Sequence, residues 1–397
     1  KGKLHKVFGA KADNGLSDLL ARSCTLDDAV HQTEVEGLCF IPRGRIPPNP
    51  SELLMHANFT AFLDEVGKRF DLVLLDTPPL LAVENLRVSF PTRQGLFEAV
   101  RGVSFDLGRE RLGVVGESGS GKSMTGRAIL GLVRPPGQVS ADRMQLDGQS
   151  ILNLSERRMR RIRGSRISMV MQDPKFSLNP VMTVGDQIIE AYRLHAGGAR
   201  TQARRKALEM LQAVQIRDPE RVMEAWPHEV SGGMGQRIMI AMMLAPDPEI
   251  LIADEPTSAL DVSVRTEVLN IMDRLVRDRG MGLIFISHDL NLVAQFCDRV
   301  LIMYAGRVVE TLAARDLHQA RHPYTQALLS SLPKVGVQIK EQRLEGIRGT
   351  PPELLNIGPG CRFRERCPYR TERCEETPVT ENISSEHSIA CWNYTEI

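Results

Sequence analysis

Gly116-Glu117-Ser118-Gly119-Ser120-Gly121-Lys122-Ser123 is the stretch that decides the fold, because it fits the pattern G-x-x-x-x-G-K-S/T of a phosphate-binding loop. An apolar run at 112–115 precedes the loop, and a helix-compatible segment at 124–132 follows it. A strand, a glycine-rich loop and a helix in this order are the context that the motif requires. The stretch therefore predicts an α/β domain that binds a nucleotide.

The residue types in this loop suit the phosphates of ATP. Glycines let backbone N–H groups turn toward phosphate oxygens, and the helix that follows directs its positive dipole end at them. We expect Lys122 to bridge the terminal phosphates and the Ser123 hydroxyl to bind Mg²⁺. The predicted ATP contacts of this loop are Gly116, Glu117, Ser118, Gly119, Ser120, Gly121, Lys122, Ser123 and Met124.

Two adjacent carboxylates, Asp254 and Glu255, end the apolar run at 250–253. Their roles are expected to differ, because adjacent like charges are costly unless a cation neutralises one of them. Asp254 is predicted to bind Mg²⁺, and Glu255 is predicted to be the general base that activates the attacking water. This strand therefore supplies the second half of a nucleotide hydrolysis site.

Four further short motifs accompany these two. They contain Gln172 at 171–174, Ser231 at 230–234, Asp261 at 258–261 and His288 at 286–289. Each motif alone is a weak signal, because a lone histidine is more often structural and Ser-Gly-Gly is an ordinary turn. In this order along one chain, however, the motifs resemble those of the ATP-binding-cassette (ABC) family.

The resemblance implies a role for each motif. Gln172 would sense the γ-phosphate, contact Mg²⁺ and communicate with a membrane partner, His288 would be the switch histidine, and Asp261 would lie in the D-loop. The signature loop would consist of Ser231, Gly232 and Gly233. Its N–H groups and hydroxyl would grip a γ-phosphate that the opposite subunit holds. One chain therefore cannot complete either ATP site.

Phe90 ends a strand-like segment at 86–90. By the same resemblance it matches the aromatic residue of the A-loop, which stacks on adenine. Stacking needs only a π-face, which many aromatic residues offer, so a core phenylalanine is the alternative.

The alternation of strand-like and helix-compatible segments predicts a mainly parallel sheet with covering helices, and a ligand at the carboxyl ends of the strands. The resemblance adds a RecA-like P-loop NTPase core, an antiparallel β subdomain and a helical subdomain at about 175–245. The ABC ATPase domain is expected at 83–320.

The signature region at 231–242 resembles that of ATPase subunits of dipeptide and oligopeptide importers, where methionine commonly replaces the signature glutamine. The segments 322–329 and 349–352 and the cysteine-containing end are similar to the C-terminal extension of that subfamily, expected at 321–397. This resemblance implies an ATPase that powers import of peptides or a related small solute through ATP-driven dimer closure. It also implies three kinds of partner: a second, paralogous ABC ATPase subunit, integral membrane permease subunits and, indirectly, an extracytoplasmic substrate-binding protein.

Two other functions remain open. One is a non-transport ABC ATPase of translation or repair, although such proteins usually carry two cassettes or long coiled-coil insertions. The other is a fusion made inactive by its N-terminal fragment.

Four of the seven cysteines lie near the end of the chain, interleaved with five arginines between 362 and 373. They are Cys361, Cys367, Cys374 and Cys391. Thiolates beside so much positive charge suggest an iron–sulfur site, and the family resemblance supports a four-iron cluster. A zinc site would more often show a C-x2–4-C pair, and the absence of any metal is the third alternative.

The composition, 42% hydrophobic and 25% charged over 397 residues, is typical of globular protein. No apolar run approaches the length that crosses a bilayer, so a peripheral place at the cytoplasmic face of the bacterial inner membrane would depend on partners. The net charge of +1 indicates no general nucleic-acid footprint. Six arginines at 157–166 are interpreted as a solvated helix face, with contact to an anion or partner as the alternative.

Residues 1–82 do not belong to the cassette. The segments 41–54 and 71–79 resemble the cytoplasmic kinase domain of bacterial tyrosine autokinases that control polysaccharide export, in which Asp76 would be a Walker B acid. No phosphate loop precedes these segments and no tyrosine-rich tail follows them. We therefore expect an incomplete α/β fragment without kinase activity.

Overall fold

The computed structural model describes residue 8 and residues 14–45, 57–74, 79–172, 177–258, 260–331, 346–355 and 358–396. The chain divides into two compact units, Lys1–Thr77 and Pro78–Ile397. Strand β3 of the larger unit spans Leu81–Thr92 and pairs Leu81 with Leu107 of β4. Leu81 and Ala82 are buried in that unit, so it begins before the expected boundary at 82/83.

The smaller unit contains short elements around a small apolar cluster. Its elements are α2 (Leu16–Leu20), α3 (Leu26–Ala29), β1 (His31–Gln32), β2 (Cys39–Phe40) and α5 (Ala57–Arg69). Leu20 and Leu26 pack with Phe62 and Val66 of α5 in its core. The kinase-like Asp76 and most of the segment 41–54 lie outside the described residues.

The larger unit is built on an eight-stranded sheet in the order β14-β15-β13-β12-β5-β11-β10-β9. Its strands are β5 (Arg111–Val115), β9 (Ile167–Val170), β10 (Ile250–Asp254), β11 (Gly282–Ser287), β12 (Arg299–Tyr304), β13 (Arg307–Ala313), β14 (Glu381–Asn382) and β15 (Ser388–Ile389). The five strands from β12 to β9 run parallel, whereas β13, β14 and β15 add antiparallel pairs. The predicted mainly parallel sheet is confirmed.

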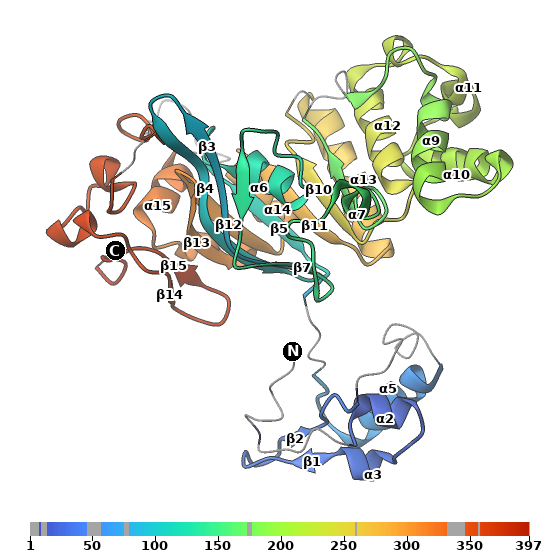
Figure 1. Ribbon diagram of the computed structural model, residues 1–397, viewed down its shortest axis with the longest axis horizontal. Helices are drawn as coiled ribbons and strands as arrows, with labels where there is room; N and C mark the ends of the chain where they lie inside the picture. The colour runs from blue at the N-terminus through green and yellow to red at the C-terminus, as the bar shows by residue number, and fades with distance from the viewer. Residues whose placement is uncertain are drawn as a thin grey trace. The chain divides into compact units, whose positions relative to one another are not determined.

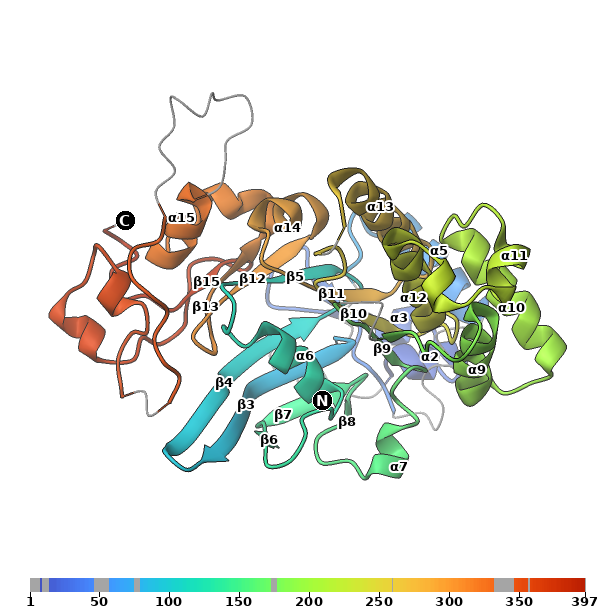
Figure 2. The same ribbon diagram turned by 90° about the horizontal axis from the view of Figure 1, so that it is seen from above.

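Apolar residues alternate between the two faces of this sheet, because successive side chains of a strand point in opposite directions. In β10, Leu251 and Ala253 join one core cluster, whereas Ile250 and Ile252 join the other. Figure 2 shows helices α13 (Val262–Asp278), α14 (Leu290–Phe296) and α15 (Pro323–Ser330) on one face, and α6 (Lys122–Ile129) on the other. Strands β10 and β11 are buried throughout, because both faces of the sheet are covered there. Their sequences are therefore nearly continuous apolar runs.

Two subdomains flank the central sheet (Figure 1). The antiparallel one pairs β3 with β4 (Gly95–Leu107), β6 (Gln138–Ser140) and β7 (Arg143–Leu146), and β7 with β8 (Gln149–Ser150). The helical one contains α9 (Val184–Ala196), α10 (Arg200–Ala213), α11 (Pro219–Glu224) and α12 (Gly232–Leu244). Both match the expected architecture. Within the described ranges, no helix is both long and apolar enough to cross a membrane.

The sequence suggested that the six arginines at 157–166, before β9, form one solvated helix face, and this interpretation is wrong. Helix α7 spans only Glu156–Met159. Arg163 donates to Leu130 O at 2.7 Å and pairs with Glu156, and Arg166 forms two hydrogen bonds with Glu249. These arginines connect neighbouring loops, which the spacing of charges alone does not reveal.

The C-terminal extension completes the edge of the main sheet. Strand β15 pairs with β13 through Glu310↔Ile389, and the buried Glu310 carboxylate contacts His387 Nε2 at 2.9 Å. Glu310 also accepts hydrogen bonds from the backbone N–H groups of Arg321 and His322. The extension is therefore part of the same compact unit as the cassette.

We expect the free energy of unfolding to fall below about pH 6.5 because of His322. Burial lowers the pKa of this fully buried imidazole to about 4, although the charge of Glu310 opposes the shift. A folded-state pKa below the unfolded value means that the stabilisation is complete above the unfolded pKa and is lost as the pH falls toward 4. The loss amounts to about 3 kcal/mol.

Denaturant titrations of the wild type between pH 7.5 and 4.5 measure this loss. His322→Gln should show a shallower dependence on pH, whereas His318→Gln, at an exposed histidine, should match the wild type. Identical pH slopes for all three proteins would assign the loss to other groups.

Candidate functional site

The phosphate loop joins the end of β5 to the start of α6. Gly121, the residue before α6, has φ of 100°, and a Cβ there would lie 2.6 Å from Ala99 O, so only glycine fits. The buried Lys122 donates from Nζ to Gly116 O at 2.7 Å and to Glu117 O at 3.0 Å. Burial lowers the pKa of Lys122, and the surrounding carboxylates oppose the shift. The lysine thus lies inside the loop where phosphates are expected.

Two of the three predicted Mg²⁺ ligands, Ser123 at the start of α6 and Asp254 at the end of β10, are in direct contact. Ser123 Oγ donates to Asp254 Oδ1 at 2.7 Å, and Asp254 is 4% exposed. Burial raises the pKa of Asp254, and the bond from Ser123 opposes this shift. Mg²⁺ prefers hard oxygen ligands of this kind, so this donor pair fits the ion.

Glu255 lies between the two other predicted catalytic residues. Gln172 Nε2 donates to Glu255 Oε2 at 3.1 Å, and His288 Nδ1 lies 3.3 Å from Glu255 Oε1. The backbone of Glu255 has φ of 47°, which is uncommon outside glycine, and its N–H donates to Ile286 O at 2.9 Å. The structure therefore brings Gln172, Glu255 and His288 together. Within the described part of the chain, no hydrogen bond joins the Gln172 side chain to Ser123 or Asp254, its two companions as predicted Mg²⁺ ligands.

The signature loop starts α12 and is exposed. Ser231 accepts a hydrogen bond from Met234 N at 3.3 Å as the helix cap. A Cβ at Gly233 would lie 2.7 Å from Val264 Cγ1, so glycine allows close approach to α13, whose first turn Asp261 caps at 3.0 Å. Among the described residues, no hydrogen bond or ion pair joins 231–233 to 116–123, and Figure 1 shows α12 apart from α6.

Phe90 is half-buried at the end of the β subdomain. Its ring lies 6.2 Å from that of Phe97, and a Cβ at Gly137 would lie 2.6 Å from Phe90 Cε1. The side chain also packs against the core cluster of this subdomain, as Met124 does. Adenine stacking by Phe90 stays a prediction beside the core alternative.

Two residues of the C-terminal extension hold the phosphate loop, and sequence reasoning missed both. Arg366 makes two hydrogen bonds to the Glu117 carboxylate, at 2.7 and 3.1 Å, and Tyr324 Oη accepts from Glu117 N at 2.9 Å. The Arg366 side chain is 4% exposed and also donates to Tyr304 Oη at 3.2 Å. No sequence pattern connects residues so far apart, although Tyr324 lies in the tail segment that pointed to the importer subfamily.

Arg366→Gln is expected to weaken ATP binding about tenfold, because it leaves the half-buried Glu117 without its cation and frees the loop. Titration with a fluorescent ATP analogue measures the affinity. Arg366→Gln/Glu117→Gln should recover part of the loss, since no unpaired charge remains. An unchanged affinity in the single variant would show that the ion pair does not position the loop.

The four C-terminal cysteines converge on one small cavity. Cys361, Cys367, Cys374 and Cys391 line it together with Phe363, and none forms a disulfide. Among the described residues, however, no group of three or more His, Cys, Asp or Glu side chains is placed to hold a metal ion. The soft sulfur donors fit an iron–sulfur cluster by chemistry, but this structure shows no such site.

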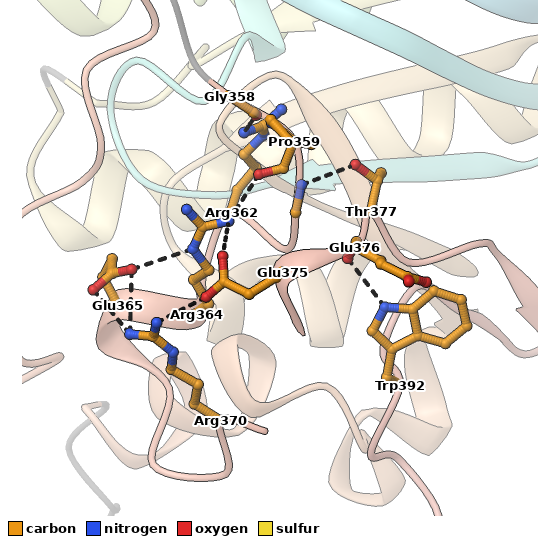
Figure 3. Close-up of polar contacts among 11 residues, drawn as sticks. Gly358, Pro359, Arg362, Arg364, Glu365, Arg370, Glu375, Glu376, Thr377 and Trp392 are labelled. Carbon is orange, nitrogen blue, oxygen red and sulfur yellow. Dashed lines mark hydrogen bonds and ion pairs between the residues drawn. The ribbon is translucent and has the colours of Figure 1, made fainter. Parts of the chain in front are cut away.

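The expectation that neighbouring arginines keep the four cysteines as thiolates is wrong for this structure. Burial raises the pKa of Cys361 and Cys367, and that of Cys391 to about 11. Two of the neighbouring arginines also pair with carboxylates: Arg364 and Arg370 each contact both Glu365 and Glu375 (Figure 3). The charge of Arg364 lowers the pKa of Cys361, but burial has the larger effect.

Comparison with known proteins agrees with this geometry. Residues 100–258 match the family described as ABC transporter, and residues 309–374 match the one described as oligopeptide/dipeptide transporter, C-terminal region. The dipeptide transport ATP-binding protein DppD of Bacillus subtilis is 45% identical over 317 residues, 79% of this chain and 94% of the relative. The oligopeptide transport ATP-binding protein OppD of Salmonella typhimurium is 44% identical over 319 residues, 80% of this chain and 94% of the relative.

Solved structures show the same fold. The dimeric structure of MJ0796, a bacterial ABC transporter cassette, is 27% identical with a TM-score of 0.54, and covers 59% of this chain and 99% of its own. A post-hydrolysis state of the same cassette, bound to ADP and Pi, is 26% identical with a TM-score of 0.54 over the same shares. Taken with the site geometry, these similarities mean that the chain belongs to the family of ABC transporter ATP-binding proteins.

Proposed function

We propose that this chain hydrolyses ATP to power the import of peptides or a related small solute by a membrane ABC transporter. One observation carries the hydrolytic half of the proposal. The Glu255 carboxylate lies between Gln172 and His288, directly after Asp254, which contacts Ser123. A base, two orienting groups and a pair of cation ligands in one place are what phosphoryl transfer to water needs.

In the proposed mechanism, the chain positions ATP and one water molecule. Lys122 and the backbone N–H groups of the loop bind the phosphates. Ser123 and Asp254 would hold Mg²⁺, which when bound neutralises charge on the phosphate oxygens. Glu255 accepts a proton from the attacking water. His288 and Gln172 orient that water and the γ-phosphate.

Dimer closure supplies the remaining ATP contacts. The exposed Ser231 and Gly232 are proposed to bind the γ-phosphate held by a second ABC subunit, which the resemblance suggests is a paralogue. Permease subunits would anchor the pair at the cytoplasmic face of the membrane, and the C-terminal match supports peptides as cargo. Co-purification with an integral membrane partner would separate this proposal from a non-transport ABC ATPase.

The Mg²⁺-dependent rate of ATP hydrolysis should rise faster than linearly with protein concentration, because each site needs two subunits. The measurement is phosphate release by the full chain over a dilution series, alone and with its permease subunits. A rate per subunit that stays constant down to the lowest concentration would exclude assembly of the site by dimerisation. ATP binding without hydrolysis until a paralogue is added would assign the second subunit to that paralogue.

We also propose that the four C-terminal cysteines bind an iron–sulfur cluster, which rests on their sharing one cavity as reduced thiols. Coordination would deprotonate these buried thiols. The assay is iron and acid-labile sulfide content after anaerobic purification. Cys374→Ser should lose both, whereas Cys297→Ser should not. Zinc in place of iron, or no metal, would refute the proposal.

For the N-terminal unit we propose no catalytic role, and its kinase resemblance stays a prediction. The alternative is that this unit blocks dimer closure. A chain that begins at Pro78, the first residue of the larger compact unit, should hydrolyse ATP at the rate of the full chain. A faster rate in the shorter chain would favour the blocked fusion.

A further inference from the structure

A second cavity, of about 230 Å³, lies where the β subdomain meets the turn between β12 and β13 and the C-terminal extension. Four arginines line it: Arg87 from β3, Arg101 from β4, Arg307 from β13 and Arg362 from the extension. None of the residues predicted to contact ATP lines this cavity. It is therefore a separate site candidate with its own charge.

The positive charge in this cavity is not balanced within the described part of the chain. Glu98 forms ion pairs with Arg101 at 3.0 Å and with Arg87 at 3.5 Å. Across the described residues, neither Arg307 nor Arg362 takes part in an ion pair. Among the described residues, one carboxylate thus pairs with two of the four guanidinium groups, and the cavity keeps an excess of positive charge.

Several buried N–H donors of these arginines also have no partner. Arg101 is 8% exposed, and its Nε and Nη1 make no hydrogen bond to any described residue. The Nε atoms of Arg307 and Arg362 are buried and also lack a hydrogen-bond partner in the described ranges. Buried polar groups are nearly always hydrogen-bonded, so unpaired donors from three strands or loops around one cavity indicate that an acceptor belongs there.

Mutual repulsion supports the same conclusion. Burial lowers the pKa of Arg307, and the charges of Arg101 and Arg87 lower it further. Burial also lowers the pKa of Arg362 to about 10, with added repulsion from Arg101 and Arg307. Holding these cations together without an anion costs stability, and an anion that neutralises them would restore it.

Three other arginines of the extension, Arg364, Arg366 and Arg370, form ion pairs with carboxylates. Arg364 and Arg370 contact Glu365 and Glu375, whereas Arg362, among the described residues, donates only to the backbone carbonyl of Gly358 (Figure 3). Carboxylates are therefore present close by in the sequence, but they bind other arginines. Arg307 and Arg362, which have no carboxylate partner among the described residues, are left to an external acceptor.

We propose that this cavity binds a phosphate-type oxyanion, either as free phosphate or as the terminal group of a small soluble phosphorylated molecule. Guanidinium groups match the planar pairs of oxygen atoms that phosphate presents, and bind them with paired hydrogen bonds. Arginines from four segments offer donors from several directions, which suits a tetrahedral anion. The Thr380 and Asn85 side chains, which also line the cavity, add neutral polar contacts.

The proposed anion site is connected to the phosphate loop through the backbone. Arg101 N donates to Gly306 O at 2.8 Å, and Gly306 N donates to Ser120 O at 3.0 Å. The Arg101 side chain also crosses Gly306, where a Cβ would lie 2.9 Å from Arg101 Cγ. The experiment must therefore distinguish the anion site from the neighbouring ATP site.

Isothermal titration calorimetry of the full chain with inorganic phosphate, at constant ionic strength and with ADP and Mg²⁺ present, tests the proposal. Arg307→Gln/Arg362→Gln should weaken binding about tenfold or more. The matched control Arg93→Gln/Arg134→Gln removes two exposed arginines outside the cavity and should bind as the wild type does. Lys122→Ala, which disables the ATP site, should also retain phosphate binding.

The thermal unfolding temperature shows whether the Arg307→Gln/Arg362→Gln variant is folded. Without phosphate, Arg307→Gln/Arg362→Gln should unfold at or above the wild-type temperature, because it relieves repulsion. A few millimolar phosphate, too little for a general salt effect, should stabilise the wild type but not this variant. A titration with glycerol 3-phosphate distinguishes the two sources of the anion. Tighter binding of this ester than of inorganic phosphate would identify a phosphorylated molecule as the ligand, and weaker binding would identify free phosphate.

The proposal fails if phosphate does not bind the wild type at millimolar concentration. It also fails if Lys122→Ala abolishes binding, which would place the phosphate in the ATP site, or if the Arg307/Arg362 variant binds as tightly as the wild type. A variant that unfolds well below the wild type without phosphate would overturn it too, because these arginines would then be satisfied within the protein.

Discussion

Glu255→Gln is expected to bind ATP with wild-type affinity and to hydrolyse it about 10²–10⁴ times more slowly. Glutamine keeps the size of the side chain and a carbonyl oxygen toward Gln172 or His288, but it cannot accept a proton from water. Neither the hydrogen bond of Lys122 to Gly116 O nor the Ser123–Asp254 pair involves this carboxylate. Binding and chemistry should therefore separate in this variant.

Binding is measured with a fluorescent ATP analogue, and chemistry by single-turnover phosphate release with the partner subunits present. Glu220→Gln, which removes an exposed carboxylate of α11, is the matched control and should behave as the wild type. Equal turnover in Glu255→Gln would refute the role of Glu255 as general base.

Lys122→Ala should weaken ATP binding by about 100-fold, and hydrolysis should disappear with it. The lysine is buried and is held by Gly116 O and Glu117 O, so its ammonium group is directed into the loop before any phosphate arrives. Alanine removes the only lysine in the loop, and the backbone N–H groups alone cannot neutralise a triphosphate.

Equilibrium binding of ATP with and without Mg²⁺ measures this effect. Lys206→Ala, which removes a lysine that pairs with Asp247 in the helical subdomain, should leave ATP affinity unchanged. Retained affinity in Lys122→Ala would mean that the nucleotide does not bind in this loop. The Lys122 and Glu255 variants together separate loss of binding from loss of chemistry.

Much of the fold was predictable because its signals are local. The phosphate loop needs Gly121 at a positive φ, and the buried strands need unbroken apolar runs at 112–115 and 250–253. Both requirements are set by neighbouring residues, so they can be predicted from the sequence. The roles of the candidate site residues stay predictions, but Ser123 with Asp254, and Gln172 with Glu255 and His288, do lie together.

Two expectations about arginines failed, because the partner of a charged side chain depends on its position in space and not on its neighbours in the sequence. The arginines at 157–166 form no long helix face, since α7 ends at Met159 and Arg163 and Arg166 pair with Glu156 and Glu249. The charge of the arginines near the C-terminal cysteines does not outweigh burial, which raises the pKa of these thiols, and several of these arginines pair with carboxylates. Ion pairs depend on the positions of the charged groups at the ends of side chains, and the order of residues in the sequence does not give these positions.

The sequence by itself determined the cassette fold and the order of its motifs, because backbone geometry and hydrophobic periodicity arise from near neighbours. Only the tertiary structure decided how the extension meets the cassette. The pairing of β15 with β13 accompanies the contact of Arg366 with Glu117 and places Arg362 beside Arg101 and Arg307. These groups are far apart in the chain, and their interaction energies exist only once the sheet has brought them together.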